Sequence, residues 1–405
     1  MQKTETKKLS NLRLKPGRQK SLLRGHPWIF SGGIATPITK FTPGQLIDVQ
    51  DDTGNFLARG YINPRSDIAV RILTTDPRQT IDQQFLAERV QTALDLRGCL
   101  DPQQTDTYRL LNTEGDFVPG AIVDSYAGVL VVQLHTAGID RLRNELIAAL
   151  VEVCKPRGIL LRNDVTVRVR EGLTREEPKV VYGEVPPEVV VKENGFKFKV
   201  NLLTGQKTGF FTDQRDKRLA LQKYVKPGLL LNCFSYTGSF SVYAAATNPQ
   251  TQVISVDQST QAMELARQNF TLNGLEPEDN RYEFVVADVF EYLQAAREQK
   301  QQFDLIILDP PAFAKTQAEK ERALKGYVRL NEMGLDVVKP GGFLVTSSCS
   351  GSVSLEEFGF SVTQAATHAN RQVQVLETYQ NGLDHPISLA APENRYLKVM
   401  FCRVL

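Results

Sequence analysis

Short apolar runs and helical patterns alternate through the second half of the chain. Five apolar runs after about residue 205 are each followed by a segment with helical periodicity. These segments predict helices near 238–247, 259–273, 289–299, 316–338 and 354–368. Such alternation is typical of a parallel sheet, because each parallel connection needs a crossover that places a helix on a sheet face. Two last runs, RQVQVLE and RYLKVMFCRVL, predict a closing antiparallel hairpin. We therefore expect a doubly wound α/β domain over residues 205–405.

Two smaller regions precede this domain. Residues 1–78 contain short alternating segments separated by turn formers, which predicts a compact β barrel. Residues 79–204 mix strands with helices expected near 80–98 and 139–153, and a hairpin is expected to turn at Glu193-Asn194-Gly195. No chemistry in this middle region rises above background, so we interpret it as a connector or a shape-reading module. A chain of 405 residues has room for three such domains.

Charge is uneven along the chain. The whole chain has a net charge of only +2, which indicates no partner. Residues 1–25 have a local net charge of +7, which suits a polyanion, although a solvated basic tail is the alternative. The charged residues of this segment are Lys3, Glu5, Lys7, Lys8, Arg13, Lys15, Arg18, Lys20 and Arg24. Trp28, Phe30 and Tyr61 are candidates for stacking on bases, but aromatic residues of a small barrel belong more often to its core.

The five cysteines are scattered and form no CxxC pair, which supports neither a zinc site nor a disulfide framework. Free thiols favour a reducing, cytoplasmic location. The sequence shows no apolar run of membrane-spanning length and no signal-peptide pattern. We therefore expect a cytoplasmic protein without a metal or a membrane partner. A homodimer is compatible with the sequence, which leaves the oligomeric state open.

Small and acidic residues stand at the ends of three successive expected strands. The first turn, LNCFSYTGSFS, includes Phe234, Ser235 and Gly238, and its small residues would let the backbone approach a ligand. Asp257 ends the second strand, where a carboxylate can accept hydrogen bonds from both ribose hydroxyls. Asp288 ends the third strand, within reach of an adenine amino group. Each aspartate could instead be a helix N-cap. The chain contains neither GxGxxG nor GxxxxGK[ST] here, which argues against a dehydrogenase and a P-loop enzyme.

The fourth and fifth strands end at reactive residues. Asp309-Pro310-Pro311 follows the fourth apolar run, and the prolines fix the backbone where the strand emerges. Cys349 follows the fifth run among three serines, so we expect it at a polar strand end. A thiolate there could attack C6 of a pyrimidine, although a lone cysteine is more often structural. Asp309 could then bind the N3/N4 edge of a cytosine.

The order of Gly238, Asp257, Asp288 and Asp309-Pro310-Pro311 resembles class I S-adenosylmethionine-dependent methyltransferases. The TSSCS stretch around Cys349 resembles the cysteine motif of RNA cytosine-C5 methyltransferases. Together with HPWIFSGGI, LARGYINPRSDIAVRIL and KTGFFTDQRDKR, these motifs are similar to those of the bacterial 23S ribosomal RNA 5-methylcytosine methyltransferase family, over essentially the whole chain. Many RNA cytosine-C5 enzymes have a second cysteine where this chain has Ala312, so product release here cannot depend on a second thiol.

This resemblance implies a PUA-like RNA-binding domain over 1–78, a central α+β domain over 79–204 and a Rossmann-like class I methyltransferase domain over 205–405. It implies S-adenosylmethionine as the cofactor and ribosomal RNA, of the 23S type, as the partner. The target cytosine would have to be unpaired or flipped. The implied cofactor contacts are Gln214, Arg215, Phe234, Ser235, Gly238, Asp257, Asp288 and Asp309.

The resemblance also implies roles at the reacting base. Asp309 and Cys349 would be catalytic, the latter as the nucleophile, and the substrate-binding residues would be Pro310, Pro311 and Phe313. Arg215 suits the cofactor carboxylate because its guanidinium is a planar fork of donors, the alternative being a solvated helix start. Lys315 could meet phosphate or be a surface lysine. His385 could reach the site, although a simple turn residue is the commoner outcome.

Two other functions remain open from the sequence. In the first, the DPP turn binds an exocyclic amine, the enzyme methylates guanine N2 or adenine N6 of ribosomal RNA, and Cys349 is only structural. In the second, the protein is an RNA assembly factor that binds the cofactor without catalysis. The sequence does not identify the base that would remove the C5 proton.

Overall fold

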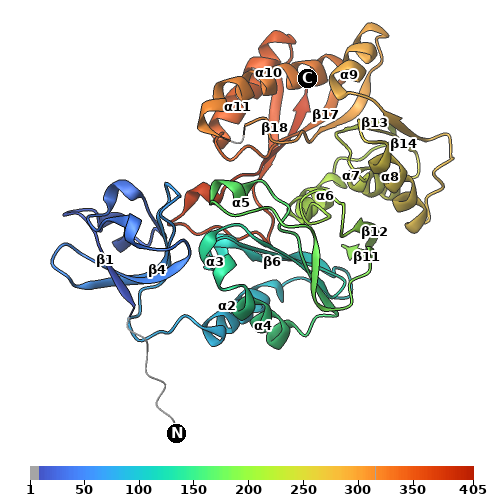
Figure 1. Ribbon diagram of the computed structural model, residues 1–405. Coiled ribbons are helices and arrows are strands. Elements are labelled where there is room, and N and C mark those ends of the chain that lie inside the picture. The colour runs from blue at the N-terminus through green and yellow to red at the C-terminus, as the bar shows by residue number, and fades with distance from the viewer. Residues whose placement is uncertain (1–8, 315) are drawn as a thin grey trace.

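The computed structural model describes residues 9–314 and 316–405. Lys315 and the first three lysines of the basic segment therefore lie outside the described residues. Figure 1 shows three parts in chain order: a blue N-terminal domain, a cyan-to-green central domain, and a C-terminal domain that ends in orange and red. A red segment of the C-terminal domain runs back toward the other two domains (Figure 1).

The N-terminal domain is built on a five-stranded sheet in the order β1-β3-β4-β5-β2. Ile47 and Val49 of one strand are fully buried while their neighbours are only partly buried, which is the two-residue period expected of a half-buried strand. The strands are β1 Ser10–Arg13, β2 Trp28–Ile29, β3 Gln45–Gln50, β4 Phe56–Ile62 and β5 Val70–Thr74, and α1 spans Lys20–Leu23.

Two of the three aromatic candidates of this domain join it to the central domain. The Tyr61 ring is buried against Gly138, and its hydroxyl donates to the Pro119 carbonyl at 2.9 Å. The Trp28 indole donates to Glu114 at 2.8 Å. Phe30 is 52% exposed. Tyr61 is therefore a core residue, and of the three aromatic candidates Phe30 is the one whose side chain is largely exposed.

The central domain has a five-stranded sheet in the order β10-β9-β8-β7-β6. The expected helix over 139–153 is two helices, because the backbone leaves helical geometry at Leu142. β6 and β10 were not predicted from the sequence. The elements are α2 Gln83–Arg97, β6 Thr107–Asn112, β7 Ala121–Tyr126, β8 Val129–Leu134, α3 Ala137–Arg141, α4 Arg143–Cys154, β9 Gly158–Leu161, α5 Val167–Arg170 and β10 Lys179–Gly183.

A separate hairpin, β11 Glu188–Glu193 and β12 Phe196–Asn201, connects the central and C-terminal domains. Its turn was correctly predicted, since Asn194 and Gly195 both have positive φ (49° and 84°), as a two-residue hairpin turn requires. The hairpin packs on the C-terminal domain, where the Asn269 side chain accepts from the backbone N–H of Lys199 at 2.8 Å.

The C-terminal sheet has the order β15-β14-β13-β16-β17-β19-β18, with β19 as its antiparallel strand. The doubly wound prediction is confirmed. The closing strands do pair antiparallel, but β19 lies between β17 and β18 instead of at the edge. The strands are β13 Gly228–Cys233, β14 Thr251–Asp257, β15 Tyr282–Val286, β16 Phe303–Leu308, β17 Val338–Ser348, β18 Val373–Tyr379 and β19 Lys398–Val404.

Helices cover both faces of this sheet (Figure 1). They are α6 Arg215–Leu221, α7 Ser239–Thr247, α8 Thr260–Leu272, α9 Val289–Glu298, α10 Lys320–Val337 and α11 Leu355–His368. The five predicted helices agree with α7 to α11 within a few residues. Among the described residues, no helix is long and apolar enough to cross a membrane.

Candidate active site

The carboxyl ends of β16 and β17 bring Asp309 and Cys349 together. The two strands pair in parallel up to Leu308 and Thr346, so the residues that follow them emerge side by side. The Ser347 hydroxyl donates to Asp309 Oδ1 at 2.5 Å, and Cys349 Sγ lies 3.6 Å from the Pro310 carbonyl oxygen. The predicted carboxylate and the predicted nucleophile therefore share one strand junction.

The polar side chains around this pair are buried. Ser347, Ser348 and Ser350 are all buried, with at most 3% of any of them exposed. Burial raises the pKa of the Asp309 carboxyl. Burial also raises the pKa of the Cys349 thiol to about 11, so at neutral pH the resting residue is a thiol. The strand end is thus polar but buried: the Ser347 hydroxyl bonds to Asp309 and the Leu308 carbonyl, and the Ser350 hydroxyl accepts from the Ala314 backbone N–H and lies 2.8 Å from the Tyr327 hydroxyl.

Gln214 contacts Asp309, and the next residue, Arg215, contacts Asp384. Gln214 Nε2 donates to Asp309 Oδ1 at 2.9 Å, and Arg215 Nη2 donates to Asp384 Oδ1 at 3.0 Å. Gln214 Oε1, Arg215 Nη1 and Asp213 Oδ1 are buried and have no hydrogen-bond partner among the described residues. Buried polar atoms are rarely left unpaired, so three of them on consecutive residues indicate that a polar ligand belongs there.

Asp384 connects this segment to the central domain. Its carboxylate accepts from Arg215, from the backbone N–H of Arg109 at 2.8 Å, and from His385 Nδ1 at 3.0 Å. Its carbonyl accepts from Arg97 at 2.8 Å. Despite full burial, the neighbouring His385 and Arg215 hold the pKa of Asp384 well below its usual range. His385 is thus a buried partner of Asp384, and its backbone N–H closes the turn on the Gly382 carbonyl at 2.8 Å.

The central domain also holds the stretch that precedes Gln214. The Tyr126 hydroxyl lies 2.8 Å from Thr208 Oγ1 and accepts from the Phe210 backbone N–H at 3.2 Å. Asp124, on the same strand β7, accepts from Thr208 Oγ1 and forms a bidentate pair with Arg109. We interpreted residues 79–204 as lacking chemistry, whereas two of their strands position the segment that carries the site.

Three further polar side chains of the site were not predicted. Asp213 Oδ2 accepts from the Tyr396 hydroxyl at 2.6 Å and pairs with Lys207 Nζ at 3.2 Å. The Lys207 ammonium also lies 4.2 Å from the centre of the Phe211 ring. Lys207 and Asp213 belong to the KTGFFTDQRDKR motif, and this motif was the signal in the sequence from which they could have been predicted. Tyr396 lies 183 residues from Asp213 in the chain, and no sequence pattern indicated that the two would be in contact.

The loop after β13 carries backbone strain at the expected cofactor position. Phe234 and Tyr236 have positive φ values of 57° and 47°, which are unfavourable for aromatic residues and occur mostly at functional loops. The Tyr236 backbone N–H donates to Asp257 Oδ2 at 2.9 Å, and the Ser259 backbone N–H donates to Oδ1 at 3.0 Å. Asp257 is therefore oriented at the end of β14 with both oxygens fixed.

Gly238 and Ser235 in this loop pack against α8. Gly238 has φ 72°, and a Cβ there would lie 2.9 Å from the Ala266 Cβ. Close packing against α8 thus leaves no room for a side chain at Gly238. Ser235 donates from its backbone to the Val256 carbonyl at 3.0 Å, and its hydroxyl lies 3.9 Å from the Met263 sulfur.

Asp288 and Phe313 have structural roles beside their predicted ones. Asp288 is exposed and caps α9, where Oδ1 accepts from the Phe290 backbone N–H at 2.8 Å. Phe313 stacks on Tyr327 of α10 at 4.7 Å between ring centres. In the DPP turn, Pro310 is buried and Pro311 is exposed. No cluster of three potential metal ligands occurs in residues 9–314 and 316–405.

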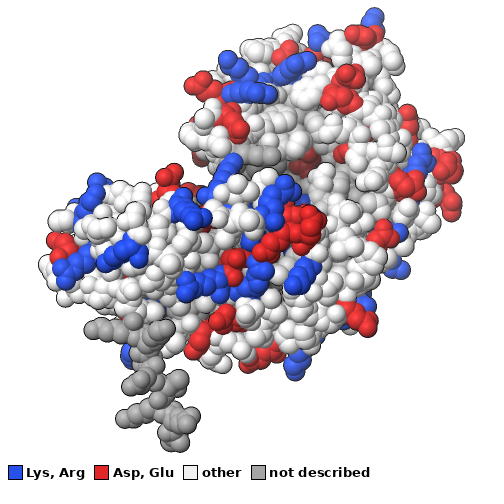
Figure 2. All heavy atoms as spheres, viewed as in Figure 1, with Lys and Arg blue, Asp and Glu red and all other residues white. Residues whose placement is uncertain are grey.

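The described part of the basic segment is exposed. Arg13, Lys15, Arg18, Lys20 and Arg24 all have exposed side chains, and residues 13–24 include no acid. Figure 2 shows Lys and Arg side chains over the face of the N-terminal and central domains, below the hollow beneath the C-terminal domain.

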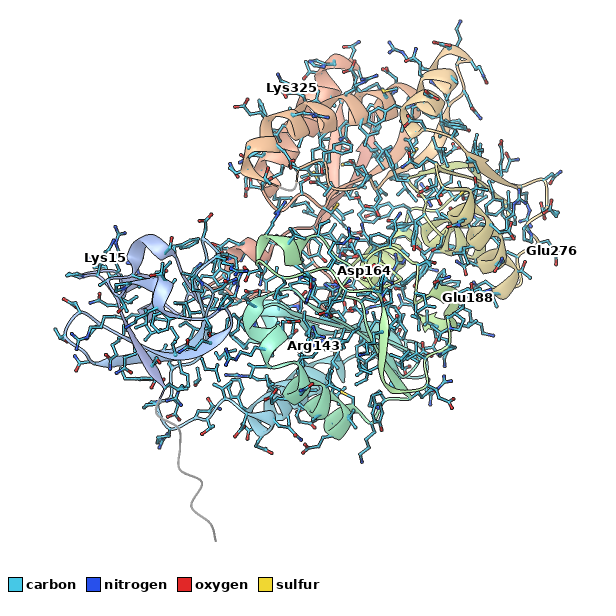
Figure 3. The ribbon with its side chains drawn as sticks, viewed as in Figure 1. Lys15, Arg143, Asp164, Glu188, Glu276 and Lys325 are labelled. Carbon is cyan, nitrogen blue, oxygen red and sulfur yellow. The ribbon has the colours of Figure 1, made fainter. Side chains whose placement is uncertain are left out.

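Basic residues of the N-terminal and central domains differ in whether acidic side chains pair with them. Figure 3 places Lys15 on the N-terminal domain and Arg143 on the central domain. Arg143 pairs with Asp140 and Glu176, which offset its charge, whereas Lys15 donates to the Gly32 carbonyl and takes part in no ion pair with any residue that the structure describes. The N-terminal segment is therefore the better candidate for contact with a polyanion.

Comparisons with known proteins agree with this architecture. Residues 12–75 match a PUA-like domain model, and residues 177–390 match the model of an S-adenosylmethionine-dependent methyltransferase. The second match begins before residue 205 and includes the β11–β12 hairpin. Two solved structures share the fold. One, described as a methyltransferase complexed with SAH, has a TM-score of 0.84 at 24% identity and covers 98% of this chain and 100% of that one.

The second, a protein from Streptococcus mutans described as SAM-dependent, has a TM-score of 0.83 with the same identity and coverage. Closer relatives in sequence are ribosomal RNA large subunit methyltransferases I. The protein of Cronobacter sakazakii is 41% identical over 97% of this chain and 98% of its own length, and that of Klebsiella pneumoniae strain 342 is 42% identical with the same coverage. S-adenosylmethionine is therefore the cofactor, and this chain belongs to the ribosomal RNA large subunit methyltransferase I family of S-adenosylmethionine-dependent methyltransferases.

Proposed function

We propose that this protein methylates C5 of a cytosine in large-subunit ribosomal RNA through a covalent bond between Cys349 and C6 of the base. The observation that carries the proposal is the strand junction that joins the Asp309 carboxyl to the Cys349 thiol. A carbon methyltransferase for pyrimidines needs both a nucleophile for C6 and a group for the N3/N4 edge. An amine methyltransferase needs only the latter.

The cofactor fits the residues at the ends of β13 to β16. Asp257 would hold the ribose and Asp288 the adenine edge, while Phe234, Ser235 and Gly238 shape the loop between them. The unpartnered Nη1 of Arg215 and Oε1 of Gln214 are a donor and an acceptor suited to the carboxylate and amino group of an amino acid. The bound cofactor would supply an electrophilic methyl group next to the target carbon.

The residues of the chain perform the remaining steps. Cys349 loses its proton and its sulfur bonds to C6, which breaks the aromaticity of the ring and makes C5 a carbon nucleophile. Asp309, whose pKa is raised by burial, can be protonated and donate to N3, which favours attack at C6. After C5 is methylated, a base takes the C5 proton, the C–H electron pair forms the C5–C6 double bond, and the Cys349–C6 bond breaks so that the sulfur leaves as a thiolate and the ring is aromatic again.

Ribosomal RNA as the substrate is supported by the names of the relatives and by the exposed basic residues 13–24. Basic side chains supply phosphate affinity that does not depend on sequence, whereas the site itself must receive a single base. Because Asp309 and Cys349 are partly enclosed, the target cytosine must be unpaired or flipped into the site.

Trapping tests this mechanism directly. Large-subunit ribosomal RNA transcribed with 5-fluorocytidine should form an adduct with the protein that survives denaturation, because no C5 proton can leave. Cys349→Ser should form no adduct and should not methylate, whereas Cys99→Ser, which alters an exposed cysteine, should behave as wild type.

Two results would contradict the proposal. Methylation by Cys349→Ser at the wild-type rate would support transfer to guanine N2 or adenine N6. Calorimetry that shows cofactor binding without methyl transfer to any purified large-subunit RNA would support an assembly factor. Bisulfite mapping of ribosomal RNA from cells with and without the protein would then locate the target.

A further inference from the structure

A cavity lies where the three domains meet, and its wall contains neither Asp309 nor Cys349. Its volume is about 300 Å³, at the small end of the range of ligand pockets, which suits a group of the size of a single base. The wall includes Leu22 and Ile72 of the N-terminal domain, Arg89 and Phe117 of the central domain, and Ser388 of the C-terminal domain.

Phe117 lines this cavity, although neither burial nor backbone preference explains a phenylalanine at its position. The side chain is 55% exposed, and the backbone is left-handed, with φ 57° and ψ 29°. Glycine is the usual residue at a helix end with this conformation, because it has no Cβ. A strained position with an exposed aromatic ring does not stabilise the free protein, and it indicates that the ring contacts a ligand.

Arg89 places a positive charge beside this ring. Its guanidinium carbon lies 5.7 Å from the centre of the Phe117 ring and 5.1 Å from that of the Phe85 ring. Its Nη2 donates to the Leu73 carbonyl at 3.2 Å. Arg89 forms no ion pair with any residue that the structure describes, and Glu88, the acid that acts on it, is exposed. Because a guanidinium keeps its charge in proteins, its remaining N–H groups can donate to a phosphate.

The acidic side chains close to the cavity already have partners. Glu114, the carboxylate in the wall, accepts from the Trp28 indole at 2.8 Å and lies 3.9 Å from the Arg71 guanidinium. Glu393 lies 3.3 Å from His26, another residue of the wall. These contacts leave Arg89 as the cation available to an anionic ligand.

Exposed basic residues continue from the cavity along the N-terminal domain. Lys20 and Arg24 are exposed and flank Leu22 in α1 and at its end. An aromatic ring next to cations is typical of surfaces that bind single-stranded nucleic acid, since the ring stacks on a base and the cations bind the backbone. The charge around the cavity therefore favours a nucleic acid strand as its ligand.

One short segment connects the cavity to the active site. Ser388 of the wall is four residues after Asp384, which accepts from Arg215. Four residues span at most about 14 Å, so the two positions are close. The turn that carries the aromatic ring also holds this segment, because the Asn112 side chain donates to the Pro386 carbonyl at 3.0 Å. The cavity is thus placed to bind a nucleotide near the target base.

We propose that this cavity binds an unpaired nucleotide of the RNA substrate other than the target, with its base stacked on Phe117 and its phosphate bound by Arg89. The inference rests on RNA as the substrate in the proposed function and adds a second binding site to it. This contact would hold the strand while a different base enters the methylation site, so the protein should prefer RNA that is single-stranded beside its target.

Fluorescence anisotropy tests the role of the ring with the whole chain and an unstructured, uridine-rich RNA of about a dozen nucleotides. Phe117→Gly removes the ring and relieves the positive φ, and we expect it to weaken binding at least about fivefold. Phe117→Tyr should bind within about twofold of wild type, because it keeps a ring that can stack. Phe30→Ala is the matched control: it removes a ring of similar exposure (52%) outside the cavity wall, and it should bind as wild type does.

Salt dependence tests the role of the guanidinium. Arg89→Met keeps an apolar side chain and removes the charge. The slope of log affinity against log salt concentration should become shallower by about 0.7, as expected when one phosphate contact of a single strand is lost. Phe117→Gly should leave the slope unchanged, because an uncharged ring releases no counterions. An unchanged slope in Arg89→Met would remove Arg89 from the phosphate contact.

Cross-linking tests the site in the wild-type protein and needs no variant. After irradiation of the complex with 5-iodouridine RNA, the peptide that carries the uridine should contain Phe117. A cross-link at Phe30 but not at Phe117 would overturn the inference. Wild-type affinity in Phe117→Gly would also overturn it and would leave the exposed ring to a protein partner. Free 5′-UMP that binds as tightly as the RNA would identify a free nucleotide as the ligand instead.

These assays use neither methyl transfer nor Cys349, so their outcome is separate from that of the proposed chemistry. If Cys349→Ser methylates at the wild-type rate, the proposed nucleophile is wrong and the result for the cavity stands. If Phe117→Gly binds RNA normally and the wild-type protein still forms the 5-fluorocytidine adduct, the role of the cavity alone is wrong. Absence of RNA binding by the wild-type protein would overturn both.

Discussion

Replacing Asp384 by asparagine should destabilise the C-terminal domain strongly. The side chain of Asp384 is fully buried and accepts from three donors, the most demanding of which is the Arg215 guanidinium at 3.0 Å. Asparagine has nearly the same shape, but it removes the negative charge and replaces one acceptor oxygen by a donor. The Arg215 charge would then remain buried, and its remaining ion pair among the described residues would be with the more exposed Asp216 at 3.5 Å.

The magnitude follows from the burial of both partners, which have at most 2% of either side chain exposed. Breaking a buried ion pair by removing one partner costs about 3–5 kcal/mol. For a domain of about 200 residues, each kcal/mol lowers Tm by about 2–4 °C. We therefore expect Asp384→Asn to lower the Tm of the C-terminal domain by roughly 6–20 °C.

Differential scanning calorimetry at pH 7 measures this change, and Asp216→Asn is the matched control. Asp216 contacts the same guanidinium but is 35% exposed, so its ion pair should contribute at most about 1 kcal/mol, which corresponds to less than about 4 °C. Equal shifts for the two variants would refute the reasoning, because burial would then not determine the cost of losing the charge.

The pH dependence gives a second check on Asp384. The pKa of this carboxyl is lowered in the folded protein. Its stabilising effect is therefore fully present above the unfolded pKa of about 3.9 and is lost as the pH falls through the folded pKa. The Tm difference between wild type and Asp384→Asn should be constant from pH 7 to 5 and should shrink below about pH 4.

Three further outcomes are expected. Gly238→Ala should lower the free energy of unfolding by about 1–3 kcal/mol, because φ is 72° and the new Cβ would lie 2.9 Å from the Ala266 Cβ. Gly274→Ala, whose Cβ would have no atom within 4 Å, should cost less in the same thermal unfolding experiment. Adduct formation with 5-fluorocytidine RNA should rise about tenfold per unit between pH 6 and 8, since the raised pKa of Cys349 keeps it a thiol there, and a flat profile would exclude thiolate formation as limiting. Alanine at the basic residues of 13–24 should weaken RNA binding and reduce its salt dependence, and an unchanged slope would remove this segment from the interface.

The sequence predicted the C-terminal domain well because its information is local. Apolar runs and helical periods follow from contacts between residues a few positions apart, and all five expected helices are present. The same rule predicted that Asp309 and Cys349 would meet, since the carboxyl ends of neighbouring parallel strands lie at one edge of a sheet. Strand order was harder: a pattern shows that the last two strands pair but not that β19 enters between β17 and β18.

The parts of the site that were not predicted depend on distant contacts. Asp384 accepts from Arg109, 275 residues away, and nothing in either segment indicates the other. The burial of the serines next to Cys349 could not be predicted from the sequence either. Their composition is polar, but their environment is set by β17 and β19 packing around them. Composition describes the side chain, whereas the pKa of the thiol depends on what surrounds it.

The position of β19 in the sheet has a consequence for synthesis of the protein. The chain makes β19 after every other strand of this sheet, yet β19 pairs with β17 on one side and β18 on the other. Until β19 is available, β17 presents an open edge next to Cys349. A growing chain can therefore assemble its N-terminal barrel and most of the loop after β13 early, but Cys349 acquires its final surroundings only in the last step. Because β19 is made last among the strands of this sheet, the Cys349 thiol is enclosed only when the sheet is complete.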